Sequence, residues 1–136
     1  MLTTPTVSVQ DPVPDDWTVV DDEITWFWAS QVTHAGMSTF HSPNSHFQDG
    51  IFQILLVRGS ASRYKIARAL LGLESGAHIE MPGVEWVQCT QYRLEPADTS
   101  VSFNNIDGEA VEAGPIQGTV VPKGARFFAT NFKREA

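Results

Sequence analysis

Short runs of β-branched and aromatic residues, each ended by glycine, proline or acidic residues, recur along most of this sequence. They are Trp17–Val20, Ile24–Ala29, Ile51–Val57, Val84–Cys89, Gln91–Glu95, Ser100–Phe103, a run through Val111, Gln117–Val121 and Arg126–Ala129. Such runs are typical of strands, and several at close spacing are typical of antiparallel sheets. One helical segment interrupts the series. The sequence therefore predicts a mainly β protein of the α+β class, an antiparallel β-sandwich or barrel with one inserted helix.

The helical segment is expected to run from Arg63 to Ser75. Ser60–Ser62 supplies N-cap candidates before it, and Gly76 is placed where a helix commonly stops. The apolar residues on one predicted face are Ile66, Leu70 and Leu73. Their spacing of i, i+4 and i+7 indicates an amphipathic helix. A stripe of this kind packs into a core more often than it lines a ligand pocket.

Composition limits the classes of function. With 136 residues, of which 42% are hydrophobic, the chain is long enough for one domain with one core. Its net charge of −7 argues against nucleic-acid binding, because a phosphate backbone requires a basic surface. A single cysteine, Cys89, cannot form an internal disulfide, which favours a reducing, cytoplasmic setting. The longest apolar run, Ile54–Val57, is too short to cross a bilayer, so any membrane contact is expected to be peripheral.

Three histidines, His34, His41 and His46, lie in the polar stretch between residues 33 and 50. Their spacing matches no common zinc motif, so we expect loop residues and no metal site.

An Asp-Gly pair carries the chemistry that stands out most in the sequence. Asp107-Gly108 follows Asn105-Ile106 and precedes Glu109. Asp-Gly is a common hairpin-turn signal, and most such pairs are only turns. A tight turn would nevertheless aim the carboxylates of Asp107 and Glu109 the same way, which suits a nucleotide or a magnesium ion. The pair alone leaves both interpretations open.

Four segments occur in order between about Trp17 and Phe132. They are His34-Ala35-Gly36 with Phe40, Pro43 and Asp49-Gly50; Val57–Arg63 with Leu73–His78; Tyr92-Arg93-Leu94-Glu95-Pro96; and Ile106–Glu109 with Gln117-Gly118 and Pro122. Together they resemble the C-terminal domain of lipid kinases of the diacylglycerol-kinase type, and specifically of sphingosine kinases.

The resemblance implies half of a two-lobed enzyme. Kinases of this family join an N-terminal α/β lobe with a Gly-Asp-Gly nucleotide loop to a β-sandwich lobe that holds the lipid. Nothing in this sequence resembles the first lobe, so the resemblance implies a fragment or a stand-alone relative with no catalytic residue of its own. The expected division is a disordered leader over residues 1–16, a partial lipid-kinase domain over 17–132 and a tail over 133–136.

The resemblance also implies a site for each substrate. Asp107, Gly108 and Glu109 would contact ATP, with ATP and magnesium held mainly by the N-terminal lobe. The implied lining of the lipid pocket is Phe40, Ile66, Leu70, Leu73, His78 and Trp86. The implied reaction of the whole kinase moves the γ-phosphate of ATP to the primary hydroxyl of sphingosine or another long-chain base, at a peripheral membrane contact.

Two alternatives stay open. The chain could be the corresponding lobe of a diacylglycerol or ceramide kinase, or a non-catalytic module that binds a lipid. In each case the isolated chain is expected to be inactive as a kinase, because the family's catalytic base belongs to the other lobe.

Overall fold

The computed structural model describes residues 7–100 and 104–126, and within these ranges the chain is mainly antiparallel strands with one α-helix. The strands are β1 (Ile24–Ser30), β2 (Phe52–Arg58), β3 (Glu85–Cys89), β4 (Gln91–Leu94), β5 (Asn104–Ile106), β6 (Glu109–Val111) and β7 (Ile116–Thr119). The helices are α1 (Arg63–Gly72) and a 3₁₀ turn, η1 (Ala77–Glu80). This composition confirms the predicted sandwich-like class with one inserted helix; the sheets stay open.

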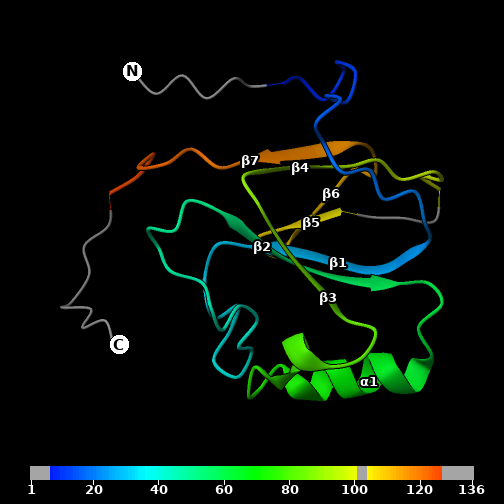
Figure 1. Cartoon of the computed structure of the whole chain (residues 1–136), viewed down its shortest axis with the longest axis vertical. Coiled ribbons are helices and arrows are strands. Elements are labelled where there is room, and N and C mark those ends of the chain that lie inside the picture. Colours follow the sequence, from blue (N-terminus) through cyan, green and yellow to red (C-terminus); the bar gives the residue numbers. More distant parts are fainter. Residues whose placement is uncertain (1–6, 101–103, 127–136) are drawn as a thin grey trace.

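The central sheet has the order β1-β2-β3, and both pairings are antiparallel. Its middle strand carries Ile54–Val57, whose side chains are all buried. Because β2 is paired at both edges and covered on both faces, the side chains from Ile54 to Val57 are apolar on both faces of the strand. Figure 1 shows α1 below this sheet and the β4–β7 pair above it.

Tyr92 joins the central sheet to the β4–β7 pair. Its ring centroid lies 5.2 Å from that of Phe27 on β1 and 5.1 Å from that of Phe52 on β2. Across the ladder Tyr92 pairs with Gly118, and a Cβ built there would lie 2.4 Å from the tyrosine ring. Glycine at this position therefore lets the ring lie flat over β7.

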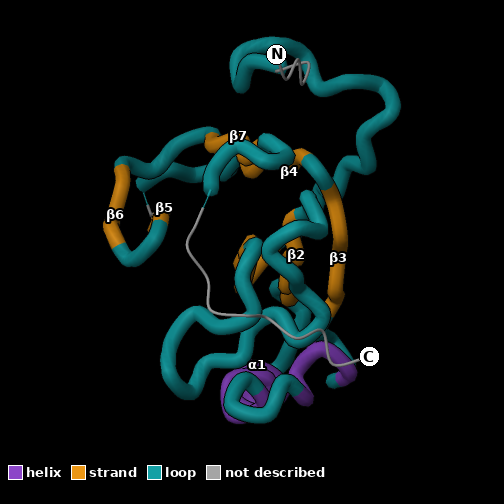
Figure 2. Tube along the Cα trace, turned by 90° about the vertical axis from the view of Figure 1, so that its left-hand side faces the viewer, coloured by secondary structure: helices purple, strands orange, loops and turns teal. Residues whose placement is uncertain are grey.

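The hairpin of β5 and β6 turns at Asp107-Gly108, as the sequence predicts. Both turn residues have left-handed backbone angles, with φ of 52° and 92°. A two-residue type I′ turn requires this combination, which explains the Asp-Gly pair. Figure 2 shows the hairpin to one side of the central sheet.

The expected strand at Trp17–Val20 is wrong, because these residues form an irregular segment with Val19 and Val20 exposed. Trp17 instead packs against the guanidinium of Arg93, 5.9 Å from its ring centre. Of the other predicted strands, residues 101–103 and 127–129 lie outside the described residues, and Ser100 and Arg126 are not in strands.

Arg93 also binds the described part of the expected leader. It donates hydrogen bonds to the carbonyl oxygens of Asp11 at 2.7 Å and Ser8 at 2.8 Å. Gln117 on β7 donates to the carbonyl oxygen of Val7, so this segment contacts both β4 and β7, and the division at residue 16 stays a prediction.

The helix begins where the sequence predicts and ends earlier. Ser62 is the N-cap, and its hydroxyl accepts a hydrogen bond from the amide of Lys65 at 3.4 Å. The last helical residue is Gly72 and not Ser75. The chain folds back over this point, and a Cβ on Gly72 would lie 2.9 Å from the backbone nitrogen of His78. Gly76 does adopt the left-handed conformation expected of a stop, but it precedes η1.

Candidate functional site

A buried cluster of aromatic and histidine side chains fills the space between α1, η1 and the central sheet. His41 from the loop before β2 and His78 from η1 are both fully buried. The ring of His41 lies 4.3 Å from that of Trp28 on β1 and 5.7 Å from that of Trp86 on β3. Trp86 is also 6.1 Å from His78. We call these four residues the histidine–tryptophan cluster.

Hydrogen bonds fix the two histidines. The Nε2 of His78 donates to the carbonyl oxygen of His41 at 2.8 Å, and the Nδ1 of His41 lies 2.7 Å from the hydroxyl of Ser42. The Nε2 of His41 has no hydrogen-bond partner within the described part of the chain. Burial, reinforced by the nearby His78, lowers the pKa of His41 to about 4. His41 is therefore uncharged at neutral pH.

The loop that carries His41 is tied directly to the helical segment. The amide of Phe40 donates to the carbonyl oxygen of Leu73 at 2.7 Å. A Cβ on Gly76 would lie 2.7 Å from the ring of Pro43 and 3.0 Å from that of Phe40. Only glycine allows this approach together with the left-handed backbone at position 76.

The structure brings four of the six predicted lipid-binding residues to this region. Phe40, Leu73, His78 and Trp86 lie around the junction of the loop, the helical segment and β3. Ile66 is half-buried. Leu70 departs from the expected buried stripe, because its side chain is 52% exposed. The residues of α1 that are buried are Ala69 and Gly72, with Leu73 following, so the inner face is rotated from the predicted one.

Sequence reasoning missed His41. The sequence places His41 with His34 and His46 in a polar loop, and of this loop only the adjacent Phe40 is expected to line the lipid pocket. No periodic pattern surrounds position 41, so nothing local signals its burial.

The predicted nucleotide residues lie together at the tip of the β5–β6 hairpin. Asp107, Gly108 and Glu109 are all exposed, and the amide of Gly108 donates to the side-chain oxygen of Asn105 at 3.0 Å. A Cβ on Gly108 would meet no atom within 4 Å. The turn leaves both carboxylates open to a ligand or to solvent.

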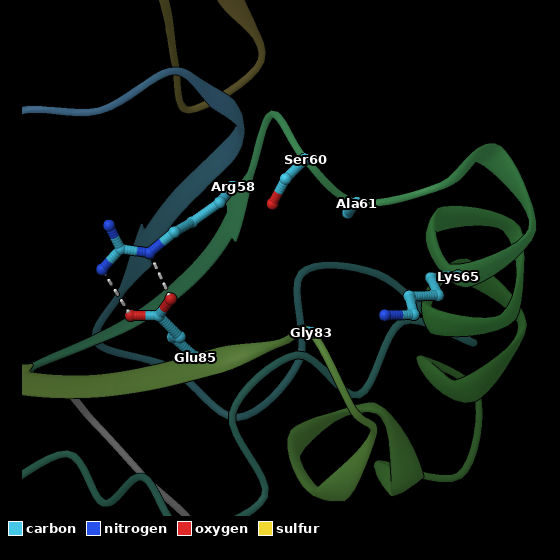
Figure 3. Close-up of a pocket in the computed structure, with 6 residues that line it drawn as sticks. All are labelled: Arg58, Ser60, Ala61, Lys65, Gly83 and Glu85. Atoms are coloured by element: carbon cyan, nitrogen blue, oxygen red, sulfur yellow. Dashed lines mark hydrogen bonds and ion pairs between the residues drawn. The ribbon is translucent and has the colours of Figure 1, made fainter.

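A second charged group surrounds Arg58 at the end of β2 (Figure 3). Its Nε and Nη2 donate to the two carboxylate oxygens of Glu85 at 2.5 and 3.1 Å, and its Nη1 donates to Asp22 at 2.8 Å. The guanidinium lowers the pKa of both carboxyl groups. No motif or spacing in the sequence predicts this group of charges. The bidentate pair with Glu85 joins β2 to β3, and the bond to Asp22 joins β2 to the segment before β1.

Within residues 7–100 and 104–126, no group of three or more His, Cys, Asp or Glu side chains could hold a metal ion. None of the helices in these ranges is long and apolar enough to pass through a bilayer.

Comparison with known proteins identifies the domain. Residues 19–129 match the family described as YegS C-terminal NAD kinase beta sandwich-like domain. Human sphingosine kinase 1 is 34% identical over 119 residues, which cover 85% of this chain and 31% of that protein. Human sphingosine kinase 2 is 31% identical over 113 residues, covering 82% of this chain and 17% of that protein.

Sphingoid long chain base kinase 5 of Saccharomyces cerevisiae is 24% identical over 119 residues, covering 85% of this chain and 17% of that protein. The chain thus spans about a third or less of the length of these relatives. It belongs to the family of YegS C-terminal NAD kinase beta sandwich-like domains.

Proposed function

We propose that this chain is the C-terminal, lipid-binding lobe of a sphingosine kinase. The whole enzyme would transfer the γ-phosphate of ATP to the primary hydroxyl of sphingosine or another long-chain base. The observation that carries the proposal is the meeting of Phe40, Leu73, His78 and Trp86 between α1 and the central sheet. These residues come from three separate segments of the sequence, and Phe40, Leu73 and His78 belong to segments that resemble sphingosine kinases.

The lipid would enter beside the histidine–tryptophan cluster. Two hollows of about 140 and 190 Å³ lie beside α1, and neither is lined by a residue of this cluster. Both are smaller than the roughly 300 Å³ at which ligand pockets usually begin. A long-chain base therefore needs α1 and the loop before β2 to separate from the sheet. Each methylene then buried would contribute about 0.8 kcal/mol, so an apolar slot of this kind can dominate affinity.

The acidic hairpin tip would contribute to the nucleotide site. Carboxylates only accept hydrogen bonds, so Asp107 and Glu109 fit the hydroxyl or amino groups of a nucleoside, or water around magnesium. They do not fit the phosphates, which require cations. The tip therefore supplies one edge of an ATP site whose phosphate and magnesium contacts come from an N-terminal lobe. The isolated chain should bind lipid and show no kinase turnover.

We also propose a cytoplasmic setting with peripheral membrane contact, because a long-chain base partitions into bilayers.

Leucine truncation tests the lipid site. Leu73→Ala removes about three carbon atoms from the buried residue that follows α1, so the affinity for sphingosine should fall by about 2 kcal/mol, or roughly 30-fold. The measurement is a titration of the purified chain with sphingosine below its aggregation limit, followed by tryptophan fluorescence. Trp28 and Trp86 report on the site directly, because both rings pack on His41.

Val87→Ala is the matched control, since Val87 follows Trp86 on β3 and its side chain is exposed on the other face of the strand. Circular dichroism verifies that both variants fold. Equal sphingosine affinity in the two folded variants would place the lipid elsewhere and refute the site.

A further inference from the structure

The outer face of α1 combines cations with large exposed apolar side chains. We define this face as Arg63, Tyr64, Arg68, Leu70 and Leu71. Tyr64 is 71% exposed, Leu71 80% and Leu70 52%. The packing of the domain uses the opposite side of the helix, where Ala69, Gly72 and Leu73 are buried. The fold itself therefore does not explain why these apolar residues are present.

The charge of α1 is opposite to that of the chain. The helix contains Arg63, Lys65 and Arg68 and no acidic residue, so it carries three of the nine basic side chains in a protein of net charge −7. Within the described ranges the ion pairs involve Arg58 and Arg93, and none involves a cation of α1. These three charges are available for an external partner.

We propose that the outer face of α1 lies flat on the surface of an anionic phospholipid bilayer. Tyr64, Leu70 and Leu71 would enter the boundary between headgroups and acyl chains, and the arginines would contact lipid phosphates. Arg68 already lies 5.9 Å from the ring of Tyr64, which places a cation beside an aromatic side chain as an interface favours. The inference rests on the proposed function, because it names the surface through which the lobe meets the membrane that holds its substrate.

A hollow next to this face fits a headgroup. It is lined by Ser62, Tyr64, Lys65, Arg68, Met81 and Pro82 and holds about 190 Å³. That volume is too small for a long acyl chain, and its mainly apolar lining carries the two cations Lys65 and Arg68, which suit a phosphate at its edge. Lys65 also borders the neighbouring hollow, where it points toward Gly83 (Figure 3).

The charge pattern favours a bilayer over a second copy of this chain. In a symmetric dimer through this face, the cations of one α1 would meet the same cations of the other, and like charges repel. A membrane of mixed anionic and neutral lipids offers phosphates to the arginines and an apolar layer to the leucines. One such membrane surface can therefore contact both the arginines and the apolar side chains of the outer face.

Vesicle binding tests the proposal. The purified chain is mixed at low salt with phosphatidylcholine vesicles that contain or lack phosphatidylserine, with no sphingoid base, and the bound fraction is measured by flotation. Binding is expected only with phosphatidylserine and should weaken as salt is added. Each cation near an anionic surface contributes about fivefold to partitioning, so Arg63→Glu with Arg68→Glu should reduce it at least about 25-fold. Leu71→Ser should also reduce it.

The charge-matched control is Lys123→Glu with Arg126→Glu, which changes two exposed cations away from α1. It should bind vesicles almost as the unchanged chain does. Equal loss in both double variants, or binding that ignores phosphatidylserine, would overturn the proposal. The proposal would also be overturned if the chain did not bind vesicles and instead formed a dimer that Leu71→Ser disrupts, because the face would then join two copies.

Sphingosine titration without vesicles separates this proposal from the proposed function. Retained sphingosine binding with no vesicle binding overturns only the membrane face. Vesicle binding without sphingosine binding supports the face and overturns the lipid site.

Discussion

His41 is a fully buried histidine whose environment favours the uncharged ring. Trp28 and Trp86 pack against it, and its Nε2 lacks a partner within the described residues. Its pKa is lowered from 6.5 to about 4 in the folded chain. Protonation at this position would place a charge beside His78 with no acid to balance it within the cluster. The buried position of His41, and with it the packing of its loop, therefore becomes less stable when the ring is protonated at low pH.

Stability should therefore fall as the solution is acidified. Below a pH of about 6.5 the unfolded chain binds a proton at His41 that the folded chain excludes until a pH of about 4. The contribution of His41 to the free energy of unfolding is complete above pH 6.5, and up to about 3 kcal/mol of it is lost as the pH falls from 6.5 to about 4. Urea unfolding across this pH range measures the loss.

His41→Leu should flatten this part of the pH profile, because the titrating group is removed and the site stays apolar. His34→Gln is the control, since His34 is exposed. An unchanged pH slope in the His41 variant would show that another group controls the acid sensitivity.

Motifs mark the residues of the proposed lipid site only in part. Phe40, Leu73 and His78 lie in segments that resemble sphingosine kinases, Trp86 lies in none of them, and all four lie around one junction. Leu70 was placed on the inner face by its spacing and is exposed. Helical spacing fixes which residues share a face, but the rotation of α1 about its own axis depends on packing, because Ala69 and Gly72 are buried and Gly72 lies against Met81 and the backbone of His78.

Among the secondary-structure elements, β7 depends most closely on a single residue. Gly118 lies beneath the ring of Tyr92, which also packs on Phe27 and Phe52. This contact holds the β4–β7 pair on the central sheet. The Gln117-Gly118 motif therefore has a packing role that does not depend on any ligand.

Gly118→Ala should reduce the free energy of unfolding by about 1–3 kcal/mol, because the new methyl group would displace the tyrosine ring. The measurement is urea unfolding followed by tryptophan fluorescence. Gly114→Ala is the control, since a Cβ there meets no atom within 4 Å. Equal stability of the two variants would show that Tyr92 moves aside freely.

Strands and helix ends differed in how far they could be predicted. The apolar run of β2, the Asp-Gly hairpin and the Ser62 N-cap each depend on local chemistry, and each was predicted. Trp17–Val20 has the composition of a strand but pairs with none, and Trp17 packs on Arg93 instead. The early end of α1 accompanies a reversal of the chain that brings the backbone of His78 against Gly72, and no apolar pattern marks this reversal.

At the scale of the whole molecule, the acidic hairpin tip and the basic outer face of α1 lie on different sides (Figures 1 and 2). The acidic hairpin tip lies to one side of the central sheet, and α1 with its basic outer face lies below it (Figures 1 and 2). In the proposed enzyme, the hairpin tip would face an N-terminal lobe and its nucleotide, and the outer face of α1 would face a membrane. The lipid would lie between α1 and the sheet.

The central claim is that this domain binds a single-chain sphingoid base, and calorimetric titration of the purified chain with sphingosine, ceramide and diacylglycerol tests it most directly. Sphingosine should bind at one molecule per chain, with a negative heat-capacity change from the buried hydrocarbon. The two-chain lipids should bind far more weakly, because the space between α1 and the sheet would have to admit a second chain. No saturable sphingosine binding, or equal affinity for ceramide or diacylglycerol, would contradict the claim.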